Sequence, residues 1–422
     1  AASAAAAPPA PGTWDALGAA AASSPAAQAG LAGYSLTPPG SEPASSPTSF
    51  VPAGAHARPG DGEVLLYRDT HHWCPFCQRV LMQLAHKRVP FTVQYVSLRD
   101  KPDWYLEAVP TGLVPAARVG GELLWESADI MAKVEEVYTD TPMLPPEGTP
   151  ERARADALVA ACDAPEVSVG AAGYRYMSGG SFGAAAGAPA PDLSELRAAF
   201  EAALRAVEEA LGESGGPFFM GEEMSLVDCM YAPSLERFGA NMPLFRGFSL
   251  RSNPQYPRLA AWYAAMDGEE AYTRYKGDDG THHLVMRRIF RLQPGEGGGP
   301  ADPEPCHGAT DGSAEAGAKL WTNREAVVAD ALKNSGVAAA AGEEDGAAAA
   351  AAADADAALR RLCARLLSAE APPPPSGAEE SARAAAVLAF VRNRVSAPRD
   401  MSAAAAAAFR AAAEEELRVA FP

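Results

Sequence analysis

Short segments with strand-like and helical spacing of apolar residues alternate over residues 61–140. Val80 and Leu84 recur at helical spacing after a strand-like stretch, and Gly120-Gly121, which joins two brief strands, is typical of a tight hairpin. The order of segments predicts a small α/β domain with a mixed sheet. Strands are expected at 63–68, 91–96, 116–119 and 122–125, and helices at 76–88, 104–106 and 127–138.

Beyond a proline-rich linker at 142–150, the spacing of apolar residues is helical. Residues 150–276 are expected to form an all-helical domain with a Gly/Ala-rich loop inserted at 164–190. The region 277–422 begins as a linker and continues as an Ala/Pro-rich helical extension. Its apolar stripe is thin, so we expect these helices to pack on the helical domain or on a partner. The expected helices are 150–163, 192–211, 225–242, 255–266 and 269–275, then 321–334, 358–367, 385–394 and 409–419.

Residues 1–60 consist mostly of alanine, proline, serine and glycine. A segment with so few large apolar side chains cannot bury a core, so we expect a disordered, low-complexity tail. The sequence starts at Ala1, and its Ala/Ser-rich beginning is nearly free of acidic residues, which fits the remnant of an organelle import signal.

Charge and hydropathy exclude two classes of protein. The net charge of the 422-residue chain is -18, which argues against general binding to nucleic acid, because the phosphate backbone would be repelled. No stretch of about 18 uncharged apolar residues occurs, so a transmembrane segment is not expected. The six cysteines are too sparse for a disulfide scaffold and suit a reducing compartment.

The strongest chemical signal is the sequence from Trp73 to Val80, WCPFCQRV, a Cys-x-x-Cys where a strand ends and a helix begins. Backbone N–H groups and the helix dipole at a helix N-terminus stabilise an anion, so we expect Cys74 to favour the thiolate. Cys77 lies one turn further into the helix and suits a resolving thiol.

Two other interpretations of the cysteine pair are open. The first interpretation is that the pair is half of a zinc site together with His71 and His72. No second Cys-x-x-Cys or His-x-x-x-His follows at the usual spacing, so no metal is expected. The second interpretation is that the cysteines are a structural pair of small buried residues. This interpretation does not explain the strand, turn and helix around them.

The chain from 63 to about 276 resembles a glutathione transferase of the cysteine type, close to the omega class and to plant dehydroascorbate reductases. The resemblance implies a thioredoxin-like N-terminal domain, an all-helical C-terminal domain and glutathione as co-substrate. It lies in motifs that follow the family's order: Cys74-Pro75-Phe76, Lys101-Pro102-Asp103-Trp104, Gly112-Leu113-Val114-Pro115, Glu126-Ser127, and Ser225-Leu226-Val227-Asp228, a capping box.

The resemblance also implies how glutathione is held. A cis Val114-Pro115 bond would leave the backbone of Val114 to pair with the tripeptide like one more strand. Glu126 and Ser127, at the start of a helix, would hold the γ-glutamyl end. Lys101 would meet the glycyl carboxylate.

In the same family the cysteine of Cys-Pro-Phe is catalytic, so Cys74 would form a mixed disulfide with glutathione and Phe76 would belong to the glutathione site. The omega and dehydroascorbate reductase pattern usually has alanine or serine where this chain has Cys77. A second thiol would allow internal resolution of the mixed disulfide, so monothiol and dithiol mechanisms both stay open.

Two functions from different classes follow. The first is a glutathione-dependent thiol transferase or reductase that acts on a small electrophile or a protein disulfide, with dehydroascorbate, protein mixed disulfides and quinones as acceptors. The second is a transferase-like structural or linker subunit of a large plastid complex, such as a photosynthetic one, assembled through the tail and the C-terminal extension.

Phrases in the extension, at 321–327 and 394–401, are similar to an extension of glutathione-transferase-like proteins in algal and plant plastids. This similarity favours the chloroplast stroma or the stromal face of the thylakoid. The cytoplasm is the alternative location.

Overall fold

The computed structural model describes residues 10–31, 48–50, 64–69, 72–98, 101–165, 167–180, 191–288, 290–294, 311–340, 346–394 and 401–420. The chain divides into two compact units. The central unit falls within Thr37–Gly308, and the terminal unit combines Ala1–Leu36 with Ala309–Pro422. Both ends of the chain therefore belong to the same unit.

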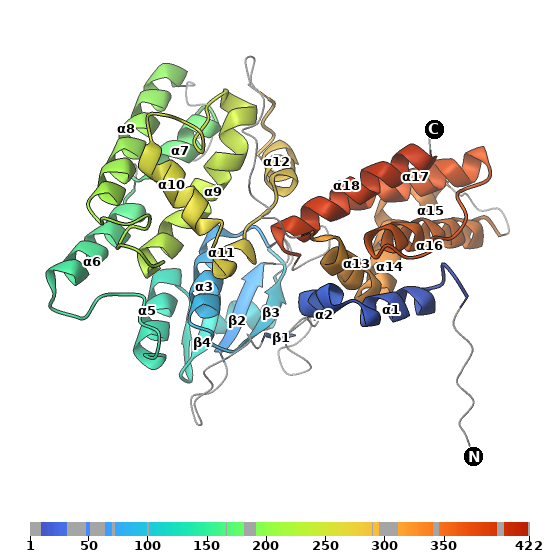
Figure 1. Cartoon of the computed structure of the whole chain (residues 1–422), viewed down its shortest axis with the longest axis horizontal. Helices are drawn as coiled ribbons and strands as arrows, with labels where there is room; N and C mark the ends of the chain where they lie inside the picture. Colours follow the sequence, from blue (N-terminus) through green and yellow to red (C-terminus); the bar gives the residue numbers. More distant parts are fainter. Residues whose placement is uncertain are drawn as a thin grey trace. The chain divides into compact units, whose positions relative to one another are not determined.

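The central unit contains a five-stranded mixed sheet (Figure 1). Its strands are β1 (Thr48–Phe50), β2 (Val64–Asp69), β3 (Phe91–Val96), β4 (Ala116–Val119) and β5 (Glu122–Leu124), and the helices among them are α3 (Pro75–His86), α4 (Asp103–Ala108) and α5 (Ser127–Val137). The strand order is β1-β3-β2-β4-β5, with β2 and β3 parallel and the other neighbours antiparallel. Gly120 and Gly121 have φ values of 58° and 86°, the left-handed conformation that the tight turn between β4 and β5 requires. The predicted mixed sheet is confirmed.

An all-helical part follows the sheet in the central unit. Its helices are α6 (Pro150–Cys162), α7 (Val169–Met177), α8 (Leu193–Gly212), α9 (Leu226–Arg246), α10 (Pro257–Met266), α11 (Glu270–Thr273) and α12 (Asp279–Arg288). Almost every residue of α9 is buried, because this helix packs on α3 as well as on α6, α7 and α12. The predicted capping box is present at its start, where the Asp228 carboxylate accepts from the Ser225 backbone N–H at 2.8 Å.

Two segments of this part differ from the prediction. The loop expected at 164–190 contains α7, whose Gly173 lies so close to α9 that a β-carbon there would be 2.2 Å from the ring of Phe238. The linker-like start of 277–422 contains α12, which also packs on α9. The buried residues of α7 do follow helical spacing, but the Gly/Ala-rich composition around them favours a loop; they are Val169, Ala172, Gly173, Tyr176 and Met177. In α12 half of the buried residues are polar, so its pattern carries less helical signal.

The terminal unit is built entirely of helices in its described residues. They are α1 (Trp14–Ser23), α2 (Pro25–Leu31), α13 (Ser313–Thr322), α14 (Arg324–Asn334), α15 (Val337–Ala340), α16 (Ala347–Leu366), α17 (Ala378–Arg392) and α18 (Ala403–Ala420). Leu17, Leu320, Leu359 and Phe409 share one core with many alanines. The thin apolar stripes of the extension are thus covered by one another and by the N-terminal helices, a partner that the sequence analysis did not consider.

The prediction of a disordered tail is wrong for residues 14–31, which form α1 and α2. A β-carbon on Gly18 would lie 2.6 Å from the Trp321 ring, so the small residues of this segment permit close helix packing. The Trp14 indole donates to the Asp356 carboxylate at 2.7 Å, and the Trp321 indole donates to the Trp14 carbonyl at 2.9 Å. Each alanine buries little area, but the alanines and these bonds together keep the segment packed in the terminal unit.

None of the helices in the described part of the chain combines the length and the apolar composition that a membrane span needs.

We expect Leu17→Ala to lower the free energy of unfolding of the terminal unit by about 3 kcal/mol, because Leu17 is fully buried and its removal leaves a cavity. Hydrogen exchange followed by mass spectrometry on peptides of α13 and α16 measures this change. Leu193→Ala, the same substitution at a position 45% exposed in the central unit, is the matched control. Equal protection of α13 and α16 in both variants would contradict the contribution of α1 to this core.

Candidate functional site

The strand register brings four predicted motifs to one end of the sheet. Tyr67 of β2 pairs with Ala116 of β4, and Ala117 pairs with Leu124 of β5. The loop that leaves β2 toward the cysteines, the residues just before β4 and the residues just after β5 therefore meet at this end. Because β3 is parallel to β2, the chain that leads to Lys101 departs there too. Neighbouring strands lie about 4.8 Å apart, so the ends of β2, β4 and β5 at this edge lie within roughly 10 Å of one another, about the span of an extended tripeptide.

Cys74 is the N-cap residue of α3, and its side chain is partly exposed. Its Sγ atom lies 3.5 Å from the carbonyl oxygen of Val114, which brings the cysteine and the proline loop into contact. Cys77 is 0% exposed and lies in a cluster with Tyr67, Tyr105 and Val114. Cys77 is the less exposed thiol, as predicted.

The two thiols have opposite pKa shifts. The pKa of Cys74 is lowered, first because the Cys77 thiol forms a hydrogen bond with it, and further because the backbone N–H groups of Cys77 and Phe76 stabilise the thiolate against burial and the nearby Asp69 carboxylate. Burial is the main reason that the pKa of Cys77 lies well above its ordinary value. Of the two adjacent thiols, Cys74 therefore has the lower pKa.

The Val114-Pro115 peptide bond is cis, as the resemblance implies. The hydroxyl of Tyr105 on α4 donates to the carbonyl of Leu113, and the Leu113 N–H is 3.3 Å from the Thr111 hydroxyl oxygen. These bonds fix the loop that carries the Val114 backbone beside Cys74.

Three side chains with polar heads surround this loop and the start of α5. A β-carbon built on Gly112 would lie 3.7 Å from the Nζ atom of Lys101, so the ammonium stands over the proline loop. Glu126 is exposed as the N-cap residue of α5, and Ser127 is 8% exposed as its first residue. Phe76 is 46% exposed in the first turn of α3. No described contact joins Glu126 or Ser127 directly to the cysteines, and their proximity follows from the strand register alone.

These residues fit glutathione in charge and donor type. Among the described residues, none forms a hydrogen bond or an ion pair with Lys101, which leaves its ammonium for a carboxylate. The first N–H groups of α5 and the Glu126 carboxylate offer complementary partners for an amino acid head group.

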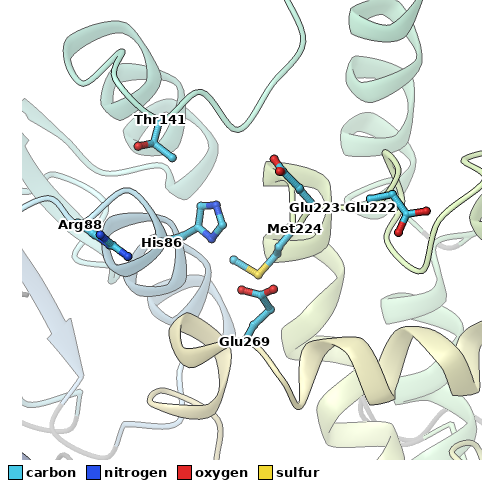
Figure 2. A pocket seen from close by; sticks show the side chains of 7 residues that line it. All are labelled: His86, Arg88, Thr141, Glu222, Glu223, Met224 and Glu269. Atoms are coloured by element: carbon cyan, nitrogen blue, oxygen red, sulfur yellow. The ribbon is translucent and has the colours of Figure 1, made fainter. Parts of the chain in front are cut away.

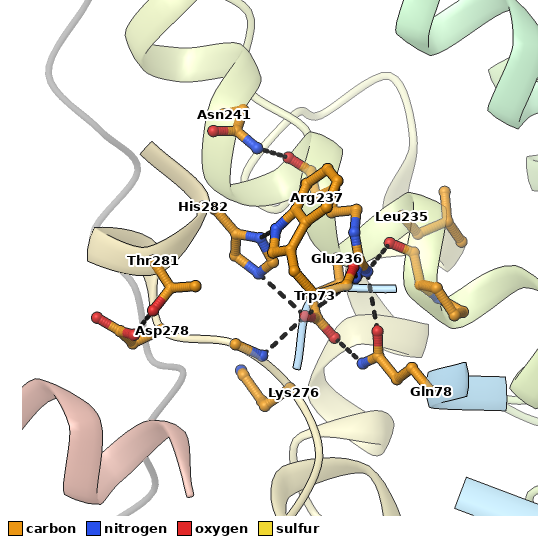
Figure 3. Close-up of polar contacts among 12 residues, drawn as sticks. Trp73, Gln78, Leu235, Glu236, Arg237, Asn241, Lys276, Asp278, Thr281 and His282 are labelled. Carbon is orange, nitrogen blue, oxygen red and sulfur yellow. Dashed lines mark hydrogen bonds and ion pairs between the residues drawn. The ribbon is translucent and has the colours of Figure 1, made fainter. Parts of the chain in front are cut away.

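The sequence analysis missed a buried polar network behind Cys74 (Figure 3). Arg237 and Glu236 on α9 and His282 on α12 contact Trp73 and Gln78, the residues on either side of the cysteine pair. All are at least nine-tenths buried except Trp73, which is partly exposed. No sequence signal connects positions so far apart along the chain.

A separate cavity of about 350 Å³ lies at the other end of α3 (Figure 2). It is lined by His86, Arg88, Thr141, Glu222, Glu223, Met224 and Glu269. A helix of 12 residues is about 18 Å long, so this cavity is remote from Cys74 and contains none of the predicted site residues. In the described part of the chain, no group of three His, Cys, Asp or Glu side chains is arranged to hold a metal ion.

Comparison with known proteins finds two family models that match the central unit in succession. The model described as Glutathione S-transferase, N-terminal domain matches residues 73–137, and the model described as Glutathione S-transferase, C-terminal domain matches residues 156–265. The chain is 30% identical over 236 residues to Protein IN2-1 homolog A of Oryza sativa subsp. japonica, an alignment that covers 55% of this chain and 88% of the relative.

Two further similarities cover the same region. Glutathione S-transferase L2, chloroplastic, of Arabidopsis thaliana is 30% identical over 237 residues, which is 55% of this chain and 72% of the relative. A crystal structure of Chlamydomonas reinhardtii dehydroascorbate reductase aligns with 54% of this chain and 99% of its own, at 21% identity and a TM-score of 0.43. With both domain models matched in order and more than two thirds of a named transferase covered at 30% identity, this chain belongs to the glutathione S-transferase family.

Proposed function

We propose that this protein is a glutathione-dependent thiol transferase in which Cys74 is the nucleophile. The observation that carries the proposal is the partly exposed Cys74, whose pKa is lowered, beside the buried Cys77, whose pKa is raised. A thiolate is the reactive form in thiol–disulfide exchange. Glutathione is the co-substrate of the family.

The proposed cycle has two exchanges. The Cys74 thiolate attacks the glutathione sulfur of a mixed disulfide, the old S–S bond breaks, and the substrate leaves as a thiolate that takes up a proton. A free glutathione thiolate then attacks the glutathione sulfur bound to Cys74. It releases glutathione disulfide and restores the Cys74 thiolate, so one free glutathione and the glutathionyl group of the substrate become one disulfide while the substrate is released as a thiol.

The surrounding residues bind glutathione and take no part in the disulfide exchange itself. The Val114 backbone pairs with the cysteinyl residue of glutathione, and Cys74, which contacts the Val114 carbonyl, lies beside the glutathione sulfur. Lys101 meets the glycyl carboxylate, while Glu126 and Ser127 at the start of α5 hold the γ-glutamyl group.

The test is reduction of a glutathione mixed disulfide, and separately of dehydroascorbate, by the purified full chain with glutathione. Oxidised glutathione is followed through glutathione reductase and NADPH. A rate above that without protein, saturable in glutathione, is the expected result. A folded protein that binds glutathione but reduces neither substrate would contradict the proposal.

We expect Lys101→Ala to raise the KM for glutathione about tenfold with little change in kcat, because a hydrogen bond to a charged group contributes about 1.5 kcal/mol or more. Initial rates at varied glutathione concentration measure the effect. Lys133→Ala is the matched control, since Lys133 lies on α5 and pairs with Glu122 and Glu136. A loss confined to kcat would contradict the role of Lys101 in binding.

The terminal unit favours a second candidate, a structural or linker subunit of a plastid assembly. It has its own core and supplies none of the predicted site residues. A relative with the word chloroplastic in its name supports a plastid location. An inactive, glutathione-binding protein that co-purifies with a thylakoid or stromal complex would favour this candidate, and immunolocalisation tests the compartment.

A further inference from the structure

The residue that precedes Cys74 is held at each of its polar groups. The Trp73 backbone N–H donates to the Asp69 carboxylate at 2.9 Å, and its carbonyl accepts from the Arg237 guanidinium at 2.7 Å. Its indole Nε1–H donates to Nδ1 of His282 at 3.1 Å (Figure 3). The Arg237 guanidinium also lies 4.8 Å from the centre of the indole ring. The orientation of Trp73 therefore depends on residues of α9 and α12.

The bonds of His282 determine its tautomer. An indole N–H can only donate, so Nδ1 of His282 must accept, and the ring proton must be on Nε2. Nε2 lies 3.0 Å from Oε1 of Glu236 and donates to it. The same oxygen accepts from the backbone N–H of Gly277 at 2.9 Å. A β-carbon on Gly277 would be 2.8 Å from Nε2, which shows how closely the chain encloses the ring.

The Glu236 carboxylate also reaches the other side of the cysteine pair. Its Oε2 accepts from the Gln78 amide at 2.6 Å, and the Gln78 carbonyl oxygen accepts from Arg237 at 2.8 Å. The backbone N–H of Gln78 in turn lies 3.2 Å from the Cys74 carbonyl in the first turn of α3. One buried carboxylate thus links His282 with the turn that presents the thiolate.

We propose that His282 is a positioning residue for Cys74: it fixes the Trp73 indole against Glu236 and so holds Cys74 at the N-terminus of α3. The inference rests on the proposed function in taking Cys74 as the reacting group. His282 lies on α12, beyond residues 156–265 that the helical family model matches. The segment after the family's helical domain therefore completes the thiol site of this chain.

The test measures the second-order rate of Cys74 alkylation by iodoacetamide against pH in the full chain. Because the chain has six cysteines, labelling is quantified by mass spectrometry on fragment ions that separate Cys74 from Cys77. We expect His282→Leu and Trp73→Phe each to lower the rate at pH 7 about threefold and to move the midpoint of the profile to higher pH, since misplaced N–H groups stabilise the thiolate less.

Two variants separate positioning from general loosening of α12. His282→Gln keeps one acceptor and one donor, so it should restore most of the wild-type profile. His283→Leu is the matched control: this neighbour bonds to the Ala240 carbonyl and contacts the Phe245 ring, away from Trp73. In the double variant Trp73→Phe/His282→Leu, the loss should be no larger than in either single variant, because both remove the same bond.

An unchanged profile in folded His282→Leu or Trp73→Phe would overturn the inference, as would an equal change in His283→Leu or no rescue by glutamine. Alkylation of Cys74 does not require catalytic turnover, so the test of the positioning role is independent of the test of the proposed function. A shifted profile in a chain that reduces no disulfide would retain the positioning role and remove the proposed function. An active chain with an unshifted profile would do the reverse.

Discussion

Replacing Cys74 with serine is expected to reduce the glutathione-dependent reduction of a mixed disulfide by a factor on the order of 10³ or more, because a serine hydroxyl is not ionised near neutral pH and forms no disulfide. Replacing Cys77 with serine should leave the rate within about threefold of the wild type, since a hydroxyl can still donate to the Cys74 thiolate. The coupled assay with glutathione reductase measures both.

The expectation for Cys77 follows from its surroundings. Its thiol is fully buried, and burial raises its pKa well above the ordinary value, so it is a poor nucleophile for resolving a disulfide on Cys74. The Cys77 thiol instead donates a hydrogen bond to Cys74, and this bond is the largest cause of the lowered pKa of Cys74. These observations favour the monothiol mechanism.

Cys77→Ala tests the donor role of Cys77, since alanine removes the hydrogen-bond donor that serine keeps. Without the donor, the pKa of Cys74 should rise and alkylation of Cys74 at pH 7 should slow about fivefold. Loss of turnover in Cys77→Ser as severe as in Cys74→Ser would contradict the monothiol mechanism and establish internal resolution by Cys77. Full activity of Cys74→Ser would remove Cys74 from the reaction altogether.

The cysteines could be predicted from sequence because their local context is contiguous. A strand, a Cys-x-x-Cys and a helix follow one another within the span from β2 to α3, and short-range geometry is enough to place a thiol at a helix N-terminus. The network behind them is not contiguous. Its members are far apart in the sequence: Gln78 and Arg237, which form a hydrogen bond, are separated by 159 positions.

The missed helices have a different cause. Large apolar residues at regular spacing predicted α8 through Leu196, Phe200, Leu204 and Val207, all of which are buried. In α1 and α2 the buried positions are Leu17, Ala21 and Ala27, where two of three are alanine. A helix face of alanines is a surface for close packing once a partner is present, but its composition is also that of a low-complexity tail.

The capping box of α9 combines a local motif with long-range bonds, which makes Asp228 the position where we expect the largest loss of stability. Its carboxylate is 0% exposed and accepts from the Ser225 N–H and hydroxyl, from the Phe219 N–H and from the Trp262 indole. Asp228→Ala leaves these donors buried without an acceptor, so the free energy of unfolding of the central unit should fall by about 4 kcal/mol.

A second capping aspartate isolates the effect of burial. Asp192 caps α8 and accepts from the Ser194 N–H and hydroxyl, but it is exposed, so Asp192→Ala should cost much less than Asp228→Ala. Hydrogen exchange of α9 peptides measures both variants without interference from the terminal unit. Similar losses in the two variants would mean that Asp228 acts as a helix cap alone. A clearly larger loss in Asp228→Ala would show that its bonds to Phe219 and Trp262 join α9 to the loop before it and to α10.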